Sequence, residues 1–85
     1  MQQTEIQRFI IRKLMNFNPP KWGASHTEGR NLAKGLPKHL VKEAKKSVED
    51  LVKKEFLIKA MKTGEWHYSL NPCKREEIFK FVNLE

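Results

Sequence analysis

The sequence predicts one small domain of the α+β class, with a helix at each end, a long helix in the middle and a β-hairpin before the last helix. Apolar residues recur every three or four positions in residues 4–17 and 38–55, which is the period of an amphipathic helix. Residues 56–70 show strand-like alternation on both sides of a Thr-Gly-Glu bend. The 85 residues show no internal repeat, so residues 1–85 are expected to form a single domain.

The first helix is expected from Thr4 to about Phe17. Thr4 and Gln7 have the spacing of a capping box, in which two side chains satisfy backbone N–H groups at the start of a helix. The helix must end before Pro19 and Pro20, because proline lacks the N–H and disfavours the helical conformation of the residue before it. The apolar face consists of Ile6, Phe9, Ile10, Leu14 and Phe17.

A short second helix is expected over residues 28–34, with Ser25 or Thr27 as its N-cap. The turn Gly35-Leu36-Pro37 ends it, because glycine adopts the left-handed conformation and proline favours a first helical turn. The third and longest helix then runs over residues 38–55. Its buried stripe is predicted to consist of Val41, Ala44, Val48, Leu51 and Val52.

The hairpin follows directly, with strands on both sides of Thr63-Gly64-Glu65. Its return strand places three side chains on one face, and these are predicted to close the core: Trp66, Tyr68 and Leu70. Trp22, in the loop after the first helix, is predicted to cover the core as well. Asn71 and Pro72 predict a last helix over residues 72–82, with Asn71 as its cap.

The net charge of +7 favours a polyanionic partner, and its distribution strengthens that interpretation. Residues 1–37 hold six basic and two acidic side chains, and residues 38–62 hold eight basic and four acidic ones. Residues 63–85 hold three basic and four acidic side chains. A lysine-rich surface that served only solubility would not concentrate its excess in this way.

A short helix, a glycine-containing turn and a longer helix form the pattern of a helix-turn-helix motif, whose second helix enters the major groove of DNA. The first turns of the helix over residues 38–55 would then lie near bases or phosphates. The candidate contacts are Lys38, His39, Lys42, Lys45 and Lys46. Residues 49–55 are instead interpreted as an ordinary solvated face with four-apart ion pairs.

Flanking elements supply the remaining candidates for nucleic-acid contacts. Arg30 and Lys34 in the second helix would contact the backbone, and the hairpin would add Lys59, Lys62 and His67. Residues 38–55 contain no Arg, Asn or Gln, the side chains that make bidentate base contacts. Because lysine acts as a point charge, we expect phosphate contacts and modest sequence specificity.

The order of elements, with a hairpin after the helix-turn-helix, resembles a winged-helix domain over residues 4–82. More narrowly, the chain resembles small, mostly uncharacterised archaeal winged-helix proteins. The matching stretches are His26-Thr27, Leu36-Pro37-Lys38-His39, Val48-Glu49-Asp50-Leu51, Lys62 with Gly64, and Ser69-Leu70-Asn71-Pro72. The chain departs from that pattern at Glu55-Phe56, where a glycine is expected before the first strand. The resemblance implies a DNA-binding protein involved in transcription regulation or chromatin.

Nothing in the sequence predicts catalysis or a cofactor. The single cysteine, Cys73, has no accompanying oxyanion loop, carboxylate pair or glycine-rich phosphate loop, and is interpreted as a packing residue. His26, His39, His67 and Cys73 do not have a recognised metal-ligand spacing. The cysteine content and the lack of a signal peptide or a membrane-spanning run predict a soluble, cytoplasmic protein.

Two alternatives to DNA binding remain open. The same lysines would serve a protein that binds structured RNA or ribosomes, because RNA is recognised through shape and backbone. A winged-helix module that binds another protein is the other alternative. A homodimer through the terminal helices is also expected, with contacts from Phe9, Phe17, Phe79 and Phe81, of which Phe81 is expected to be exposed.

Overall fold

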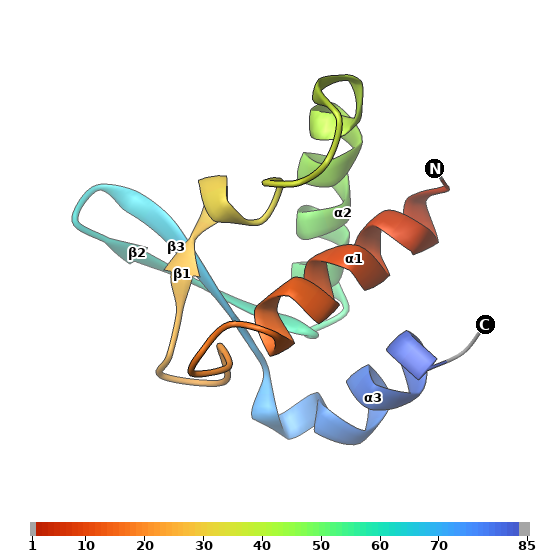
Figure 1. The fold of residues 1–85 in the computed structure, drawn as a ribbon. Helices are drawn as coiled ribbons and strands as arrows, with labels where there is room; N and C mark the ends of the chain where they lie inside the picture. Colours follow the sequence, from red (N-terminus) through yellow and green to blue (C-terminus); the bar gives the residue numbers. More distant parts are fainter. Residues whose placement is uncertain (1, 84–85) are drawn as a thin grey trace.

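Three α-helices and a three-stranded antiparallel sheet make up residues 2–83, the part of the chain that the computed structural model describes (Figure 1). Helix α1 crosses α2, the sheet lies beside them, and α3 lies at the end where the chain leaves β3. Within these residues no helix is long and apolar enough to cross a membrane. The elements are α1 (Gln3–Met15), β1 (Thr27–Glu28), η1 (Gly29–Asn31), η2 (Lys38–Leu40), α2 (Val41–Lys53), β2 (Leu57–Lys62), β3 (Glu65–Leu70), η3 (Pro72–Lys74) and α3 (Arg75–Asn83), where η denotes a 3₁₀ turn.

The sheet has the order β1-β3-β2, with the hairpin β2–β3 in register from Leu57↔Leu70 to Lys62↔Glu65. Only Thr63 and Gly64 lie between the two strands, both with positive φ (48° and 79°). This is the backbone that a two-residue hairpin turn needs, because it follows the twist of the strands. The hairpin was therefore predicted correctly, except that Glu65 belongs to β3.

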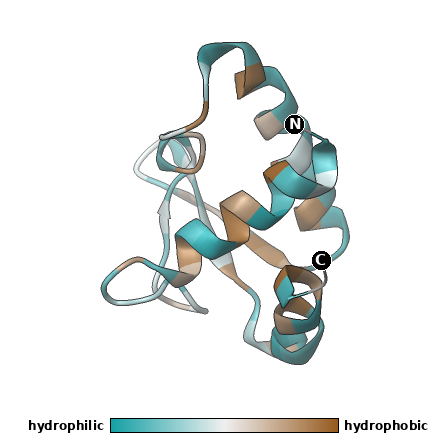
Figure 2. Ribbon diagram, turned by 45° about the vertical axis from the view of Figure 1, so that its right-hand side comes forward, coloured by the Kyte–Doolittle hydropathy of each residue, from teal (hydrophilic) through white to brown (hydrophobic). Residues whose placement is uncertain are grey.

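The core lies where α1 meets α2, α3 and the inner ends of the hairpin strands. Hydrophobic and hydrophilic stretches alternate along the helices, as the helical period requires (Figure 2). Ile11 is buried although it lies outside the predicted stripe, because α1 has neighbours on two sides. The buried apolar residues are Ile6, Ile10, Ile11, Leu14, Leu32, Ala44, Val48, Leu51, Leu57, Leu70, Ile78 and Val82.

The predicted helix over residues 28–34 is wrong. β1 pairs with β3 here, and only the three-residue turn η1 is helical. The hydroxyl of Thr27, expected to cap a helix, instead accepts a hydrogen bond of 2.9 Å from Asn31 Nδ2. Gly29 lies so close to the ring of Tyr68 that a Cβ atom there would be 2.9 Å from Cε2. Strand pairing with a distant segment therefore decides the local conformation.

The start of α1 also differs from the prediction. The helix begins at Gln3, with Gln2 as its N-cap, and Glu5 Oε1 accepts a hydrogen bond of 3.4 Å from the Gln2 N–H. Thr4 already lies inside the helix, and Gln7 is 3% exposed. The predicted capping box of Thr4 and Gln7 therefore lies two residues too late, and Gln7 instead belongs to the interface between α1 and α2.

The third predicted helix is confirmed as α2, preceded by the 3₁₀ turn η2. Its end is a Schellman motif, in which the N–H groups of Glu55 and Phe56 donate to the carbonyls of Val52 and Leu51 (both 3.0 Å). Glu55 has φ 66°, the left-handed conformation that favours glycine. The position where the winged-helix pattern has a glycine is therefore one where the backbone favours glycine.

Several aromatic side chains lie elsewhere than predicted. Trp66 is 46% exposed, so the prediction that it closes the core is wrong, whereas Leu70 is fully buried and Tyr68 is partly buried against the core. Phe79 is 41% exposed. Phe81, expected to be exposed, packs partly buried against Phe56, with 5.6 Å between ring centroids.

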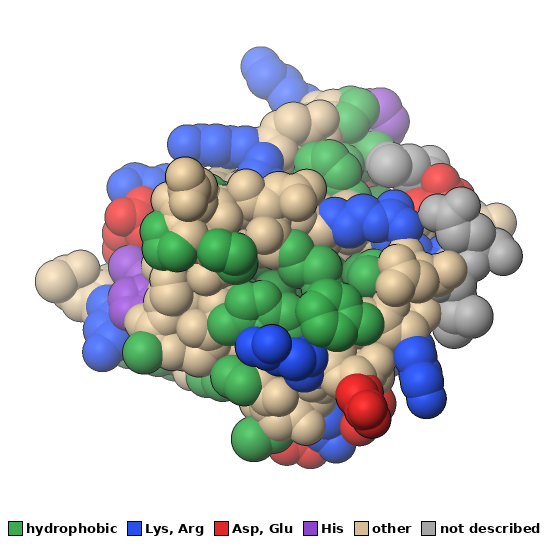
Figure 3. Space-filling view, turned by 60° about the horizontal axis from the view of Figure 1, so that its bottom comes forward, with side chains coloured by type: hydrophobic (Ala, Val, Ile, Leu, Met, Phe, Trp, Pro, Cys, Tyr) green, Lys and Arg blue, Asp and Glu red, His purple; other side chains and the backbone are tan. Residues whose placement is uncertain are grey.

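Trp22 packs against the core as predicted, and its outer edge forms part of an apolar surface with Phe79. Their ring centroids are 5.8 Å apart, and the Arg75 guanidinium lies 4.7 Å from the Trp22 ring centroid. Figure 3 views this end of the molecule and shows hydrophobic side chains gathered together, with basic side chains beside them. Cys73 is exposed, so its interpretation as a packing residue is wrong.

Candidate nucleic-acid interface

The outer side of α2 carries exposed lysines. Lys42, Lys45 and Lys46 are exposed, whereas Ala44, Ser47, Val48 and Leu51 are buried on the inner side. Exposed acidic residues interrupt this outer side at Glu43 and Glu49. The helical period therefore separates an apolar face from a predominantly basic one.

Lys38 and His39 are exposed in the turn η2, before the first residue of α2. A 3₁₀ turn has three residues per turn, so residues four apart do not line up across it. The four-residue spacing of Lys38, Lys42 and Lys46 would place them in one row on a continuous α-helix, but Lys38 lies in η2 and does not continue the row. Both η2 residues extend the basic surface beyond the N-terminal end of α2.

A groove of about 740 Å³ lies between α2, the segment 29–34 and the hairpin. Four of the predicted contact residues line it, namely Arg30, Lys34, Lys45 and Lys59. Its apolar lining includes Leu32, Ala33, Val41, Ala44, Val48, Trp66 and Tyr68. Residues from three separate segments therefore meet here, although the helix predicted for Arg30 and Lys34 is absent.

Lys34 lies in the turn that follows η1, and its backbone carbonyl accepts a hydrogen bond from Lys13 Nζ. Partial burial, together with repulsion from the Lys34 ammonium, lowers the pKa of Lys13 from its ordinary value. This contact ties the end of α1 to the turn that carries Lys34.

The hairpin presents an aromatic ring together with a lysine. Lys59 Nζ lies 4.2 Å from the centroid of the Trp66 ring, a cation–π distance. Side chains alternate along a strand, so Lys59, Trp66 and Tyr68 share the sheet face that lines the groove. Lys62 is exposed beside the turn and projects from the opposite face.

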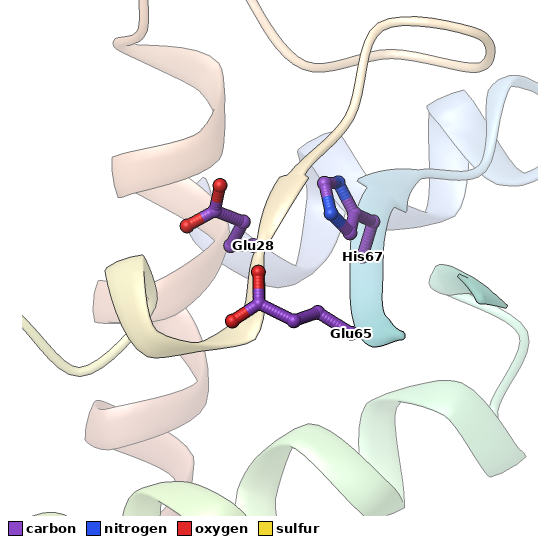
Figure 4. A group of neighbouring side chains, drawn as sticks. All are labelled: Glu28, Glu65 and His67. Atoms are coloured by element: carbon purple, nitrogen blue, oxygen red, sulfur yellow. The ribbon is translucent and has the colours of Figure 1, made fainter. Parts of the chain in front are cut away.

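His67 lies on that opposite face and does not line the groove. Glu28 is its direct partner on β1, and Glu65 is two residues away on β3 (Figure 4). One ligand atom from each of these three residues lies within 4.8 Å of the others. The structure therefore places His67 with two carboxylates rather than with the lysines that line the groove.

Arg30 lies between the groove and the cluster of Glu28, Glu65 and His67. Its Nη2 is 2.5 Å from Glu28 Oε2, and its Nη1 is 3.6 Å from Glu65 Oε1. The Arg30 side chain remains 67% exposed, so both ion pairs are solvated and weak. Its guanidinium can exchange these carboxylates for other anions without leaving a buried charge unpaired.

A polar contact between α1 and α2 fixes the helix that carries the lysines. Gln7 Nε2 donates a hydrogen bond of 2.8 Å to Asp50 Oδ2, and Lys54 Nζ lies 3.1 Å from the same oxygen. The hydrogen bond from Gln7, followed by that from Lys54, lowers the pKa of the Asp50 carboxyl from its ordinary value. This network holds the C-terminal half of α2 against α1.

Prediction from the sequence missed two features of these surfaces. Trp66 was assigned to the core, although it lies next to the tip of the β2–β3 hairpin, which extends away from the helices (Figure 1). The cluster of Glu28, Glu65 and His67 arises from the pairing of β1 with β3, and the alternation in β3 alone gives no sign of it.

Comparisons of the chain with protein-family models, with curated proteins and with solved structures find no match.

Proposed function

We propose that this chain is a non-enzymatic winged-helix protein that binds double-stranded DNA, as a transcription regulator or a chromatin-associated factor. The observation that carries the proposal is the exposed basic face of α2, which adjoins a groove with further basic residues from two other segments. A helix of this kind fits the major groove, and lysines at several points neutralise phosphates.

The order of elements and the sheet order β1-β3-β2 support the winged-helix assignment. In this assignment α2 is the recognition helix and the β2–β3 hairpin is the wing. The three-residue turn η1 stands in the position of the second helix of an ordinary helix-turn-helix, so the element that precedes α2 is shorter than in that motif. We infer that Arg30 contacts the DNA backbone from this turn and Lys34 from the turn that follows it, and that Lys59 and Lys62 do so from the wing.

Affinity is expected to come mainly from phosphates, because lysine holds them as a point charge and reads bases poorly. The exposed Trp66 adds a surface on which a base or sugar can pack. Structured RNA is the second candidate ligand, and the same observation supports it, since Trp66 and the lysines would suit an irregular or single-stranded region equally well.

A second copy of the chain is the partner that we propose for the apolar surface of Trp22 and Phe79. Phe79 projects from α3 with 41% of its surface exposed, and its ring contacts that of Trp22, so that the two form an apolar surface that a dimer would cover. A dimer would present two copies of α2, and these would bind half-sites about one helical turn apart.

The decisive experiment is a fluorescence-anisotropy titration of the whole chain against duplex DNA and duplex RNA of equal length, at two salt concentrations. The double variant Lys42→Ala/Lys46→Ala is expected to weaken binding to all sequences and to reduce the salt slope by about two. The double variant Lys53→Ala/Lys80→Ala, with the same change in net charge outside the proposed interface, serves as the control.

Three results would contradict the proposal. Equal losses in the two double variants would mean that only net charge matters. Tighter binding to duplex RNA than to duplex DNA would favour the RNA-binding alternative. An absence of binding to either nucleic acid at about 0.1 M salt, where long-range attraction is screened, would favour a protein-interaction module.

A further inference from the structure

The face of the sheet opposite the groove brings together side chains of the types that bind transition metals. Glu28 projects from β1, and Glu65 and His67 project from β3, so that one imidazole and two carboxylates meet across a pair of strands (Figure 4). No sequence spacing indicates this set, because Glu28 and Glu65 are brought together only by strand pairing.

The distances suit a metal ion after a small adjustment. One ligand atom from each residue lies within 4.8 Å of the others. A tetrahedral zinc ion with bonds of about 2.0–2.2 Å needs ligand atoms about 3.4 Å apart. The Glu28 and Glu65 side chains are 32% and 47% exposed, so changes of their rotamers can close the remaining gap.

The hydrogen bonding of His67 is an independent indication. Its Nδ1 lies 2.8 Å from His26 Nδ1, so that one of these atoms donates a proton and the other accepts it. His67 Nε2 is buried and has no hydrogen-bond partner among the described residues. When His67 Nδ1 is the donor, Nε2 carries a bare lone pair. This is the arrangement of metal-binding histidines, whose second nitrogen donates to a neighbouring acceptor.

A bound metal would satisfy this nitrogen, which otherwise remains buried without a partner. The side chains of Glu28 and Glu65 are 32% and 47% exposed, so water can occupy the remaining coordination positions. We propose that Glu28, Glu65 and His67 bind a divalent transition-metal ion of the zinc class, with water completing its coordination.

The ligand set favours this class of ion over magnesium or calcium. Imidazole nitrogen binds zinc, cobalt and nickel well, whereas the hard alkaline-earth ions take oxygen ligands. Two carboxylates balance the charge of a divalent ion. The guanidinium of Arg30, 2.5 Å from Glu28 and 3.6 Å from Glu65, competes with it for the same oxygens.

The test is calorimetric titration of the whole chain with Zn²⁺, together with the visible absorption of Co²⁺ as a report on its coordination. All variants carry Cys73→Ser, which removes an exposed thiol that would bind zinc by itself. We expect one ion per chain. Glu65→Gln and His67→Ala should each weaken binding by about tenfold or more. Arg30→Gln should strengthen binding, because it removes the competing cation.

His39→Ala is the matched control, because His39 is an exposed histidine in η2 and belongs to no such cluster. If His67→Ala fails to fold, Glu65→Gln decides the result alone, since that side chain is exposed and the change preserves its shape. Binding that is absent, that survives Glu65→Gln unchanged, or that is lost in His39→Ala would overturn the proposal.

Discussion

The end of α2 contains a glutamate where the backbone favours glycine, and replacing it gives a well-defined stability prediction. Glu55 has φ 66° in the Schellman motif. An L-residue in this conformation costs about 1–2 kcal/mol relative to the right-handed one. Glycine avoids this cost but makes the unfolded chain more flexible, which offsets about 0.4–1 kcal/mol. Glu55→Gly should therefore stabilise the fold by about 0.5–1 kcal/mol.

Thermal unfolding followed by circular dichroism measures this change. For a domain of this size the gain corresponds to a rise in Tm of about 2–8 °C. Glu55→Ala is the matched control, because it also removes an acidic side chain from the negative end of the helix dipole but keeps the cost of positive φ. If Glu55→Ala raised Tm as much as Glu55→Gly, the gain would come from charge and the conformational argument would be wrong.

Three further predictions concern other parts of the fold. Gly29→Ala should destabilise the protein by about 1–3 kcal/mol in urea unfolding, because the new Cβ would lie 2.9 Å from Tyr68 Cε2; unchanged stability would show that the Tyr68 ring moves aside freely. Because folding lowers the pKa of Asp50, its carboxylate stabilises the fold above the ordinary value of 3.8, and this contribution is lost as the pH falls through the folded pKa. The stability advantage over Asp50→Asn, measured from pH 7 to 2, should therefore shrink at acidic pH, and a constant difference would contradict the assignment. Phe79→Glu should convert the proposed dimer to a monomer in sedimentation experiments, whereas a wild-type chain that is already monomeric at all concentrations would contradict that surface.

Residues 4–17 and 38–55 were predictable because their apolar spacing extends over several turns, and burial of that face stabilises the helix they form. The error at residues 28–34 has the opposite cause. A few capping residues favoured a helix there, but pairing of β1 with β3 and the contact of Gly29 with Tyr68 favoured an extended chain. Both partners lie about forty residues away, and a local pattern cannot include such a contact.

The candidate site also has a part that the sequence predicted correctly and a part that it did not. The exposure of Lys42, Lys45 and Lys46 followed from the helical period, because it is fixed once the buried stripe of α2 is known. The position of His67 did not follow, since the sequence gives the alternation within β3 but not which face is turned toward α2. The position of Trp66 was predicted wrongly for a related reason. Alternation places Trp66 on the same face as Leu70, but Trp66 lies at the end of β3 next to the turn, beyond the core.

Arg30 connects the two proposed sites, and its position determines how they influence one another. Its guanidinium lines the groove beside α2 and also forms ion pairs with Glu28 and Glu65 across the edge of the sheet. A cation bound by those glutamates would displace the guanidinium, and the exposed Arg30 side chain would become available to a phosphate in the groove. Each ligand would then favour the other by the same factor, because coupling between two binding equilibria is reciprocal. The coupling should be modest, since the ion pairs that it breaks are solvated and each contributes little by itself. Arg30 is therefore the residue at which metal binding and polyanion binding are expected to be linked, whereas Lys42 and Lys46, which make no contact with the glutamates, should contribute to polyanion binding alone.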